Sequence, residues 1–341
     1  MRYILMVILL IGTSIPPSAA ARGTTAPRPN PPTCRAPFTA LRHPTPAAGA
    51  PPEPTYRDLV YASRSPQNIL DLYLPATPGP HPLVLWVHGG GWQSGDKTDT
   101  PALFLRDAGY AVASINYRLS GEAPFPAQIH DVKAAVRWLR AHAHDYDLAA
   151  SRMGAWGSSA GGHLVALLGT AGDQADLEDL SMGNPTVSSR VQGVVDWYGP
   201  TDFLQMDAQA QAAGCPSSSH NAADSAESRL MGCPIQTCAS QVARANPLTY
   251  VSPDDPPFLL HHGTADCVVA PGQSSILAAA LTTAGVSVDL HAVTGAGHGG
   301  PAFQSSTIRQ QVHDFFAAHL IGATVYLPRL SVDRVEPPGE H

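Results

Sequence analysis

Short apolar runs alternate with longer amphipathic stretches along the chain from about residue 55 onward. Several of these runs are nearly continuous in apolar residues, which is typical of strands that are covered on both faces of a sheet. The pattern predicts seven strands: Ile69–Leu74, Leu83–Val87, Ala111–Ile115, Met153–Trp156, Val191–Trp197, Phe258–His262 and Val286–Val293.

The stretches between the predicted strands have the periodicity of helices. Apolar residues recur at steps of three and four from Val132 to Leu139, and Arg137 lies off that face. Helices are also predicted at Gly162–Leu168, Gly272–Ala284 and Ser305–Leu320. Strands that alternate with helices in this way predict an α/β fold, in which a mostly parallel sheet is flanked by helices.

One segment, from about residue 199 to 253, breaks the alternation. It is polar, rich in Ser and Cys, and has only weak helical signals. A connection of this length between two strands is usually functional, and open α/β sheets bind ligands at the carboxyl ends of their strands. We therefore expect a cap-like excursion above that edge of the sheet.

The N-terminus has the order of a secretory signal peptide. Arg2 supplies a positive charge, residues 4–11 are apolar, and residues 18–21 are small. We therefore predict cleavage near Ala20 or Ala21 and a secreted protein. The apolar run is shorter than the ~20 residues that span a bilayer, which argues against a stable membrane anchor. A disordered N-terminal tail is the alternative.

These patterns divide the chain into four parts. The signal peptide covers residues 1–21 and is followed by a linker over 22–54, which is rich in Pro, Ala and Thr. The folded domain is predicted over 55–322 and a C-terminal tail over 323–341.

The charge of the chain argues against some classes of partner. Charged residues make up 14% of the 341 residues, the formal net charge is −7, and Lys and Arg do not cluster. We therefore expect no binding to nucleic acid or to anionic lipid through a basic patch.

Export would permit disulfide bonds. The chain has five cysteines, Cys34, Cys215, Cys233, Cys238 and Cys267. Because this number is odd, at least one of them is unpaired within the chain. Cys233 and Cys238 could close a short loop, and Cys215 and Cys267 could tie the excursion to the core. The spacing does not decide the connectivity.

The candidate nucleophile is Ser159, in the segment Gly157-Ser158-Ser159-Ala160-Gly161. This segment follows a predicted strand and precedes a predicted helix. A serine on such a tight turn needs small neighbours, and the turn exposes its hydroxyl group. Gly- and Ser-rich turns are also common without function, but here the strand and helix context is present. Ser158 is one residue out of register and is interpreted as structural.

The candidate oxyanion hole is the segment His88-Gly89-Gly90-Gly91-Trp92, directly after the strand Leu83–Val87. Consecutive glycines let the backbone approach a ligand and present unhindered N–H donors. α/β-Hydrolases use a loop in this position for that purpose. We assign the donors to Gly90, Gly91 and Ala160, and interpret His88 as a residue that holds the loop.

A serine nucleophile needs a base and an acid that orients the base. His298 lies between glycines after the last predicted strand, and Asp266 follows the strand Phe258–His262. The order Ser159, Asp266, His298 is the order of the α/β-hydrolase triad.

Other acids and histidines fit the triad positions less well. Asp254 and Asp255 are interpreted as solvated, one of His261 and His262 as a packing residue, and His291 as structural. Asp202 could line the site, and Asp131 is interpreted as a helix cap or a partner of Arg118. The chain has neither a His-Glu-x-x-His motif nor paired Cys-x-x-Cys motifs, so we predict no metal site.

With these residues identified, the chain resembles secreted bacterial α/β-hydrolases of the feruloyl-esterase-like and hormone-sensitive-lipase-like carboxylesterase families. The resemblance spans about residues 55–320 and rests on His88–Trp92, Asn116–Leu119, Phe125-Pro126 with Asp131, Gly157–His163, Trp197–Pro200, His262–Asp266 and Gly297–Gly300. It implies an eight-stranded sheet and ester hydrolysis without a cofactor. The family pattern would make Ser159 the nucleophile, His298 the base and then the acid, and Asp266 the residue that orients it. Trp92, Trp197 and Tyr198 are candidates for walls of the substrate site.

The substrate and the class of activity stay open at this point. The expected partner is a small-molecule or polysaccharide-linked ester, either an acetyl or feruloyl ester or a general short-chain ester. A serine peptidase on the same fold is the alternative enzyme, and a catalytically inactive binding module is the alternative outside enzymes. The acyl group, the alcohol and the oligomeric state are not determined by the sequence.

Overall fold

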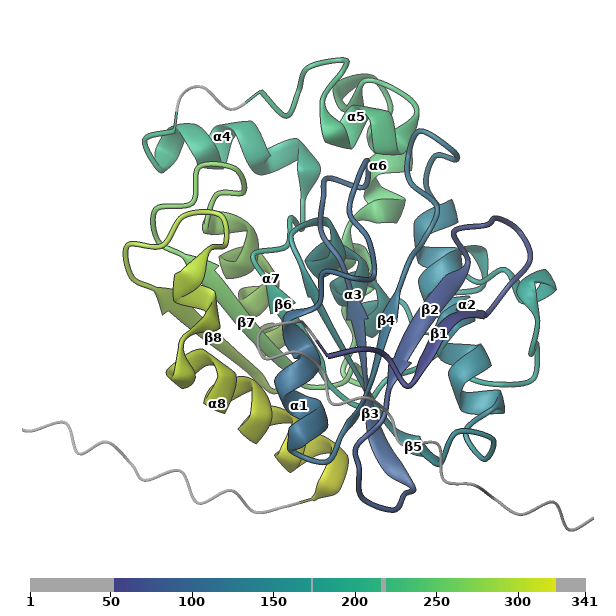
Figure 1. Ribbon diagram of the computed structural model, residues 1–341. Helices are drawn as coiled ribbons and strands as arrows, with labels where there is room; N and C mark the ends of the chain where they lie inside the picture. The colour runs from purple at the N-terminus through teal and green to yellow at the C-terminus, as the bar shows by residue number, and fades with distance from the viewer. Residues whose placement is uncertain (1–51, 173, 216–218, 323–341) are drawn as a thin grey trace, which may run out of the picture. The chain divides into compact units, whose positions relative to one another are not determined.

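Eight strands form one sheet in the order β1-β2-β4-β3-β5-β6-β7-β8 (Figure 1). The structure, a computed structural model, describes residues 52–172, 174–215 and 219–322, all of which belong to one compact unit. The strands are β1 (Tyr56–Val60), β2 (Ile69–Tyr73), β3 (His81–Val87), β4 (Ala111–Ile115), β5 (Leu148–Ser158), β6 (Val194–Trp197), β7 (Phe258–Gly263) and β8 (Val288–Val293). β1 and β2 pair antiparallel, and every pair from β4 to β8 is parallel.

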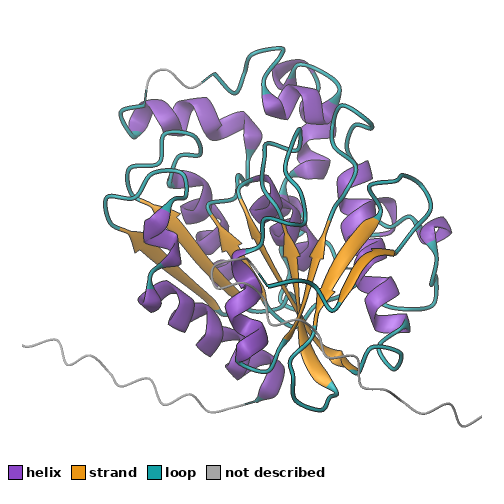
Figure 2. Cartoon of the chain, viewed as in Figure 1, coloured by secondary structure: helices purple, strands orange, loops and turns teal. Residues whose placement is uncertain are grey.

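Helices cover both faces of this sheet (Figures 1 and 2). They are α1 (Phe104–Asp107), α2 (Ala127–Ala141), α3 (Ala160–Thr170), α4 (Met206–Ala212), α5 (Ala226–Met231), α6 (Ala239–Ala245), α7 (Gly272–Thr283) and α8 (Ser306–Phe316), which continues into a π-helical turn at Ala317–Ile321. Short 3₁₀ turns lie at Pro101–Leu103, Ala175–Leu177, Leu180–Met182, Phe203–Gln205, Ile235–Thr237, Pro247–Thr249 and Pro301–Gln304.

The central strand β3 shows how the core is built. All seven of its residues are buried, and successive side chains point to opposite faces of the sheet. Leu83 and Leu85 pack with the apolar faces of α2 and α3, whereas Val84 and Trp86 pack with residues of α1 and α8. The near-continuous apolar run therefore reflects burial on both faces, as the sequence predicted.

The fold class and seven of the eight strands agree with the sequence prediction, with ends shifted by a few residues. β1 was missed because four of its five residues are exposed and it has no apolar run. The predicted helix Ser305–Leu320 is α8 together with the π-helical turn that follows it.

The predicted excursion folds as α4, α5 and α6 with short turns, and it lies above the carboxyl ends of the parallel strands (Figure 1). Two disulfides hold it. Cys215 is bonded to Cys267, which ties the excursion to the loop after β7, and Cys233 is bonded to Cys238 within the excursion. These pairs are the two that the sequence suggested, whereas Cys34 lies outside the described residues.

Asp131 accepts hydrogen bonds from Arg118, at 2.6 Å from Nη2 and at 2.8 Å from the backbone N–H. The ion pair was one of two predicted roles. The other role, a helix cap, is wrong, because α2 begins four residues earlier at Ala127.

The predicted signal peptide, the C-terminal tail and the linker up to residue 51 lie outside the described residues, so these assignments stay predictions. No helix in the described part of the chain is long and apolar enough to cross a membrane.

Candidate active site

Ser159 lies on the turn between the end of β5 and the start of α3. Its backbone has φ 54° and ψ −120°. Residues other than glycine rarely adopt this conformation, which costs about 1–3 kcal/mol. The backbone N–H of Ser159 donates to the carbonyl of Trp197 at 2.8 Å, which fixes the turn against β6. The turn lifts the Ser159 side chain out of the sheet edge and into a pocket.

The glycines on either side of Ser159 are required by close backbone contacts. A Cβ atom on Gly157 would overlap the backbone of Gly161, and a Cβ on Gly161 would overlap the carbonyl oxygen of Val87. The small residues of the motif therefore let α3 start directly against β3 and β5.

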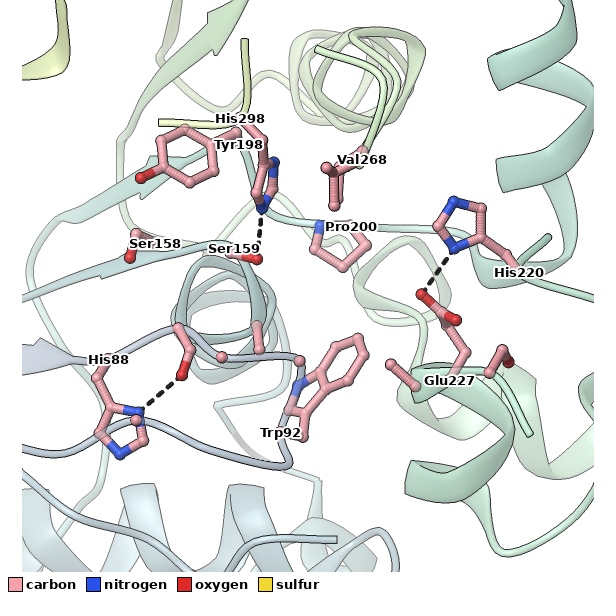
Figure 3. A pocket seen from close by; sticks show the side chains of 18 of the residues that line it. His88, Trp92, Ser158, Ser159, Tyr198, Pro200, His220, Glu227, Val268 and His298 are labelled. Atoms are coloured by element: carbon pink, nitrogen blue, oxygen red, sulfur yellow. Dashed lines mark hydrogen bonds and ion pairs between the residues drawn. The ribbon is translucent and has the colours of Figure 1, made fainter. Parts of the chain in front are cut away.

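The three predicted triad residues come together at this point (Figure 3). Nδ1 of His298 lies 2.7 Å from Oδ2 of Asp266, and Nε2 of His298 lies 2.8 Å from Oγ of Ser159. A carboxylate can only accept, so Nδ1 of His298 carries the hydrogen. Nε2 of the neutral ring is then an acceptor, and the Ser159 hydroxyl donates to it.

Asp266 is almost fully buried, and its surroundings favour the ionised form. The N–H groups of Val268 and Val269 donate to its Oδ1 at 2.8 and 2.9 Å. Burial alone would raise the pKa of Asp266, but hydrogen bonds from His262 and His298 outweigh it and hold the pKa well below its usual range. Asp266 therefore stays charged and orients the His298 ring.

His262 was one of the two histidines considered from sequence as a packing residue, and it has a more specific position. It is buried, with Nε2 2.8 Å from the carbonyl of Val269 and 3.4 Å from Oδ2 of Asp266. Its Nδ1 lies 2.7 Å from the hydroxyl of Ser274. His262 therefore supports the loop that carries Asp266.

The glycine-rich loop lies against the Ser159 turn. Gly90 and Gly91 both have positive φ, and a Cβ on Gly89 would lie 3.3 Å from the Cβ of Ser159. The backbone N–H groups of Gly90, Gly91 and Ala160 donate to no acceptor among the described residues. Ala160 is also the first residue of α3, where the helix dipole favours negative charge. These three N–H groups are free to bind an oxyanion.

His88 holds this loop, as expected. Its Nδ1 lies 2.8 Å from the carbonyl of Gly89, and its ring stacks on Tyr117 at a centroid distance of 4.4 Å. The Tyr117 hydroxyl donates to the carbonyl of His88 at 3.0 Å. Burial lowers the pKa of His88, so the ring is neutral and acts through packing.

The pocket above Ser159 has a volume of about 610 Å³. Its lining comes from the glycine-rich loop, the Ser159 turn, the loops after β6, β7 and β8, and the excursion: His88, Gly89, Gly90, Gly91, Trp92, Gly95, Asp99, Ser158, Ser159, Ala160, Tyr198, Pro200, Ser219, His220, Ser225, Ala226, Glu227, Val268, Val269 and His298.

Two of the three predicted wall residues line this pocket. Trp92 does so although it is 2% exposed, and the ring of Tyr198 lies 4.7 Å from that of His298. Trp197 does not line it. The side chain of Trp197 is buried and packs edge-on against Trp156 at 4.7 Å, so we correct its role to core packing.

The other acids and histidines that were weighed lie away from Ser159. Asp202 and Asp255 accept hydrogen bonds from backbone N–H groups of turns, and the exposed Asp254 accepts from the Ser252 hydroxyl. Asp255 is buried, so its interpretation as solvated is wrong. His261 and His291 form a stacked pair against α8. Across residues 52–172, 174–215 and 219–322, no three His, Cys, Asp or Glu residues are placed to hold a metal ion.

Sequence reasoning missed His220 and Glu227, which reach the pocket from the excursion (Figure 3). Nδ1 of His220 lies 3.0 Å from Oε1 of Glu227. The segment around them has neither a recognisable motif nor helical periodicity, so no sequence signal indicated this pair.

The family of the chain follows from its match to known proteins. Residues 70–281 match the family model BD-FAE, and this match covers more than half of the 341 residues. The chain belongs to the BD-FAE family.

Among its curated relatives is esterase LipC of Mycobacterium tuberculosis, which is 30% identical over 80% of this chain and 64% of that protein. The probable carboxylic ester hydrolase LipM of the same organism is 29% identical over 62% of this chain and 48% of that protein. The chain thus spans about half to two thirds of the length of these relatives.

Solved structures of esterases are similar to this chain. A truncated carbohydrate esterase from gut microbiota is 32% identical, with a TM-score of 0.69 over 78% of this chain and 96% of that chain. A bifunctional GH43-CE protein of Bacteroides eggerthii is 36% identical, with a TM-score of 0.70 over 78% of this chain and 35% of that chain. The chain has the α/β-hydrolase fold of these esterases, as predicted.

Proposed function

We propose that this protein is a secreted serine esterase that hydrolyses carboxylic esters through an acyl-enzyme at Ser159. The observation that carries the proposal is the continuous chain of hydrogen bonds from Ser159 through His298 to the buried Asp266. Next to it lie three backbone N–H groups that have no acceptor in the described part of the chain. A nucleophile, a base held by an acid, and an oxyanion site around one point are the requirements for acyl transfer.

The reaction has two steps. In the first, Nε2 of His298 takes the proton of the Ser159 hydroxyl while Oγ attacks the ester carbonyl carbon. The N–H groups of Gly90, Gly91 and Ala160 stabilise the oxyanion, where the loss of one donor costs about 3–4 kcal/mol. The C–O bond to the alcohol then breaks, and His298 gives its proton to the leaving alkoxide.

In the second step, His298 takes a proton from water as the water oxygen attacks the acyl carbon of the Ser159 ester. The second tetrahedral intermediate collapses, the carboxylic acid leaves, and the proton returns to Ser159. The Asp266 carboxylate remains ionised and stabilises the imidazolium that forms in each step.

We further propose that the esters are acetyl or feruloyl groups on extracellular polysaccharide. Two similar structures are described as carbohydrate esterases or as proteins with such a module, and a third, 25% identical with a TM-score of 0.60, is an acetyl ester-xyloside bifunctional hydrolase from Caldicellulosiruptor lactoaceticus. The sequence pattern of a signal peptide is consistent with an extracellular substrate.

The test is release of p-nitrophenol from p-nitrophenyl acetate by the mature protein and by Ser159→Ala. We expect the variant to lose at least about 10³-fold in kcat, because the nucleophile is gone. Ser158→Ala is the matched control, since it removes a neighbouring hydroxyl that is not bonded to His298, and it should lose less than about tenfold. Equal activity of Ser159→Ala and the wild type would refute the mechanism, and an inactive wild type would favour a binding module.

A further inference from the structure

The wall of the pocket that the excursion supplies carries a buried ion pair. Glu227 is the second residue of α5, and its side chain is 6% exposed. Its Oε1 lies 3.0 Å from Nδ1 of His220, whose side chain is 14% exposed. Both residues line the same pocket as Ser159 and His298. Neither residue takes part in the proposed acyl transfer.

The backbone of His220 is also held in place. Its N–H donates to Oδ1 of Asp207 at 2.6 Å. Burial lowers the pKa of His220, but the hydrogen bond and the charge of Glu227 outweigh this effect and raise it. Glu227 thus favours the protonated form of His220, and the contact between them fixes the position of the Glu227 side chain.

One oxygen of this carboxylate is available to a ligand. Oε2 of Glu227 accepts no hydrogen bond from a described residue, although the side chain is more than nine-tenths buried. A buried ion pair stabilises a fold no more than apolar residues of similar volume do. Fold stability therefore does not explain why His220 and Glu227 occupy this wall of the pocket. A carboxylate oxygen that faces a pocket is an acceptor for ligand hydroxyl groups.

The rest of the pocket restricts the kind of ligand. In Figure 3, Pro200 and Val268 lie between Ser159 and the His220–Glu227 pair, and Val268 is 55% exposed. The lining contains neither Lys nor Arg. A group bound here meets an apolar surface next to Ser159 and an acceptor beyond it, with neither Lys nor Arg to bind an acid. A neutral sugar ring, which has apolar C–H faces and hydroxyl groups at its edge, fits this arrangement.

We propose that Glu227, held in place by His220, is a specificity residue that accepts hydrogen bonds from the hydroxyl groups of a neutral sugar in the ester substrate. The proposal rests on the proposed function, because it places the ester carbonyl of the same molecule at Ser159.

The experiment compares two esters on the wild type and on Glu227→Gln, which keeps the shape of the side chain and removes its charge. Acetylated xylobiose carries sugar hydroxyl groups, whereas p-nitrophenyl acetate carries none. We expect kcat/KM for acetylated xylobiose to fall about 10- to 100-fold, the effect of weakening a charge-assisted hydrogen bond. The value for p-nitrophenyl acetate should stay within about twofold of wild type. Asp224→Asn is the matched control, an exposed carboxylate on the same excursion that does not line the pocket, and it should change neither value.

A binding measurement separates this proposal from the proposed function. In the Ser159→Ala background, calorimetry should show that acetylated xylobiose binds. Glu227→Gln should raise its Kd by about the same factor by which it lowers kcat/KM. An equal loss of kcat/KM on both esters would show that Glu227 has only a structural role, which would contradict the proposal. An unchanged kcat/KM for acetylated xylobiose, or no binding of this ester, would also overturn it. Failure of the proposed function has a different signature, namely p-nitrophenyl acetate hydrolysis that survives Ser159→Ala.

Discussion

The two disulfides should contribute unequally to stability, and the difference can be calculated from the chain that each one closes. Cys215 and Cys267 are 52 residues apart, whereas Cys233 and Cys238 are five apart. A crosslink lowers the entropy of the unfolded chain in proportion to the logarithm of the loop length. This relation gives about 4 kcal/mol for the long loop and about 2 kcal/mol for the short one.

We therefore predict that Cys215→Ala/Cys267→Ala lowers the free energy of unfolding by about twice as much as Cys233→Ala/Cys238→Ala. The assay is urea unfolding of the two double variants and the wild type, followed by circular dichroism. An equal loss in the two variants would refute this account of the disulfides, and so would a larger loss from the short loop.

The two double variants should also differ in their catalytic activity. Cys267 follows Asp266 directly, and its disulfide joins this loop to the excursion that carries Glu227. Without the crosslink, we expect kcat/KM for p-nitrophenyl acetate to fall about tenfold or more, because small displacements of the triad slow the reaction. The Cys233–Cys238 disulfide lies within the excursion and does not join it to the loop of Asp266, so its removal should change kcat/KM by less than about twofold.

Three further predictions concern single residues. Burial raises the pKa of Asp196 to about 6, so its ionisation destabilises the fold as the pH rises from about 4 to 6. Asp196→Asn should therefore raise the free energy of unfolding by about 3 kcal/mol at pH 8 and by much less at pH 4, measured by urea unfolding. Gly161→Ala should destabilise the protein by about 1–3 kcal/mol and lower kcat, because its Cβ would push α3 away from the carbonyl of Val87; a thermal melt like that of wild type would contradict this. Asp266→Asn should lower kcat for p-nitrophenyl acetate by about 10⁴-fold, because His298 would lose the acceptor that holds its tautomer; a loss below tenfold would show that another acid orients the ring.

Much of the fold follows from the sequence because burial leaves a local pattern. β3 and β4 are buried along their whole length, so their residues form continuous apolar runs. The antiparallel edge strand β1 is mostly exposed and has no such run, so it could not be distinguished from the linker before it. The triad residues were identified because each of them lies in the turn or loop after a strand, and parallel strands bring such positions to one edge.

The remaining features of the site depend on contacts between distant segments. Trp197 is the last residue of β6 and packs among residues of α8, whereas Tyr198 follows the strand with a φ of 46° and its ring lies beside that of His298. The sequence placed both residues near the site but did not determine their direction. His220 and Glu227 lie on a segment without periodicity, and the contact of His220 with Val268 joins positions 48 residues apart. Local patterns carry no signal for such a contact.

The central claim is that Ser159 is the nucleophile, and covalent labelling tests it most directly. The wild-type protein is treated with a fluorophosphonate probe, digested, and mapped by mass spectrometry, with Ser158→Ala and Ser159→Ala treated in parallel. The account predicts one label per chain on Ser159, an unchanged label in Ser158→Ala, and no label in Ser159→Ala. A label on another residue, or full p-nitrophenyl acetate activity in a protein that takes no label, would contradict it.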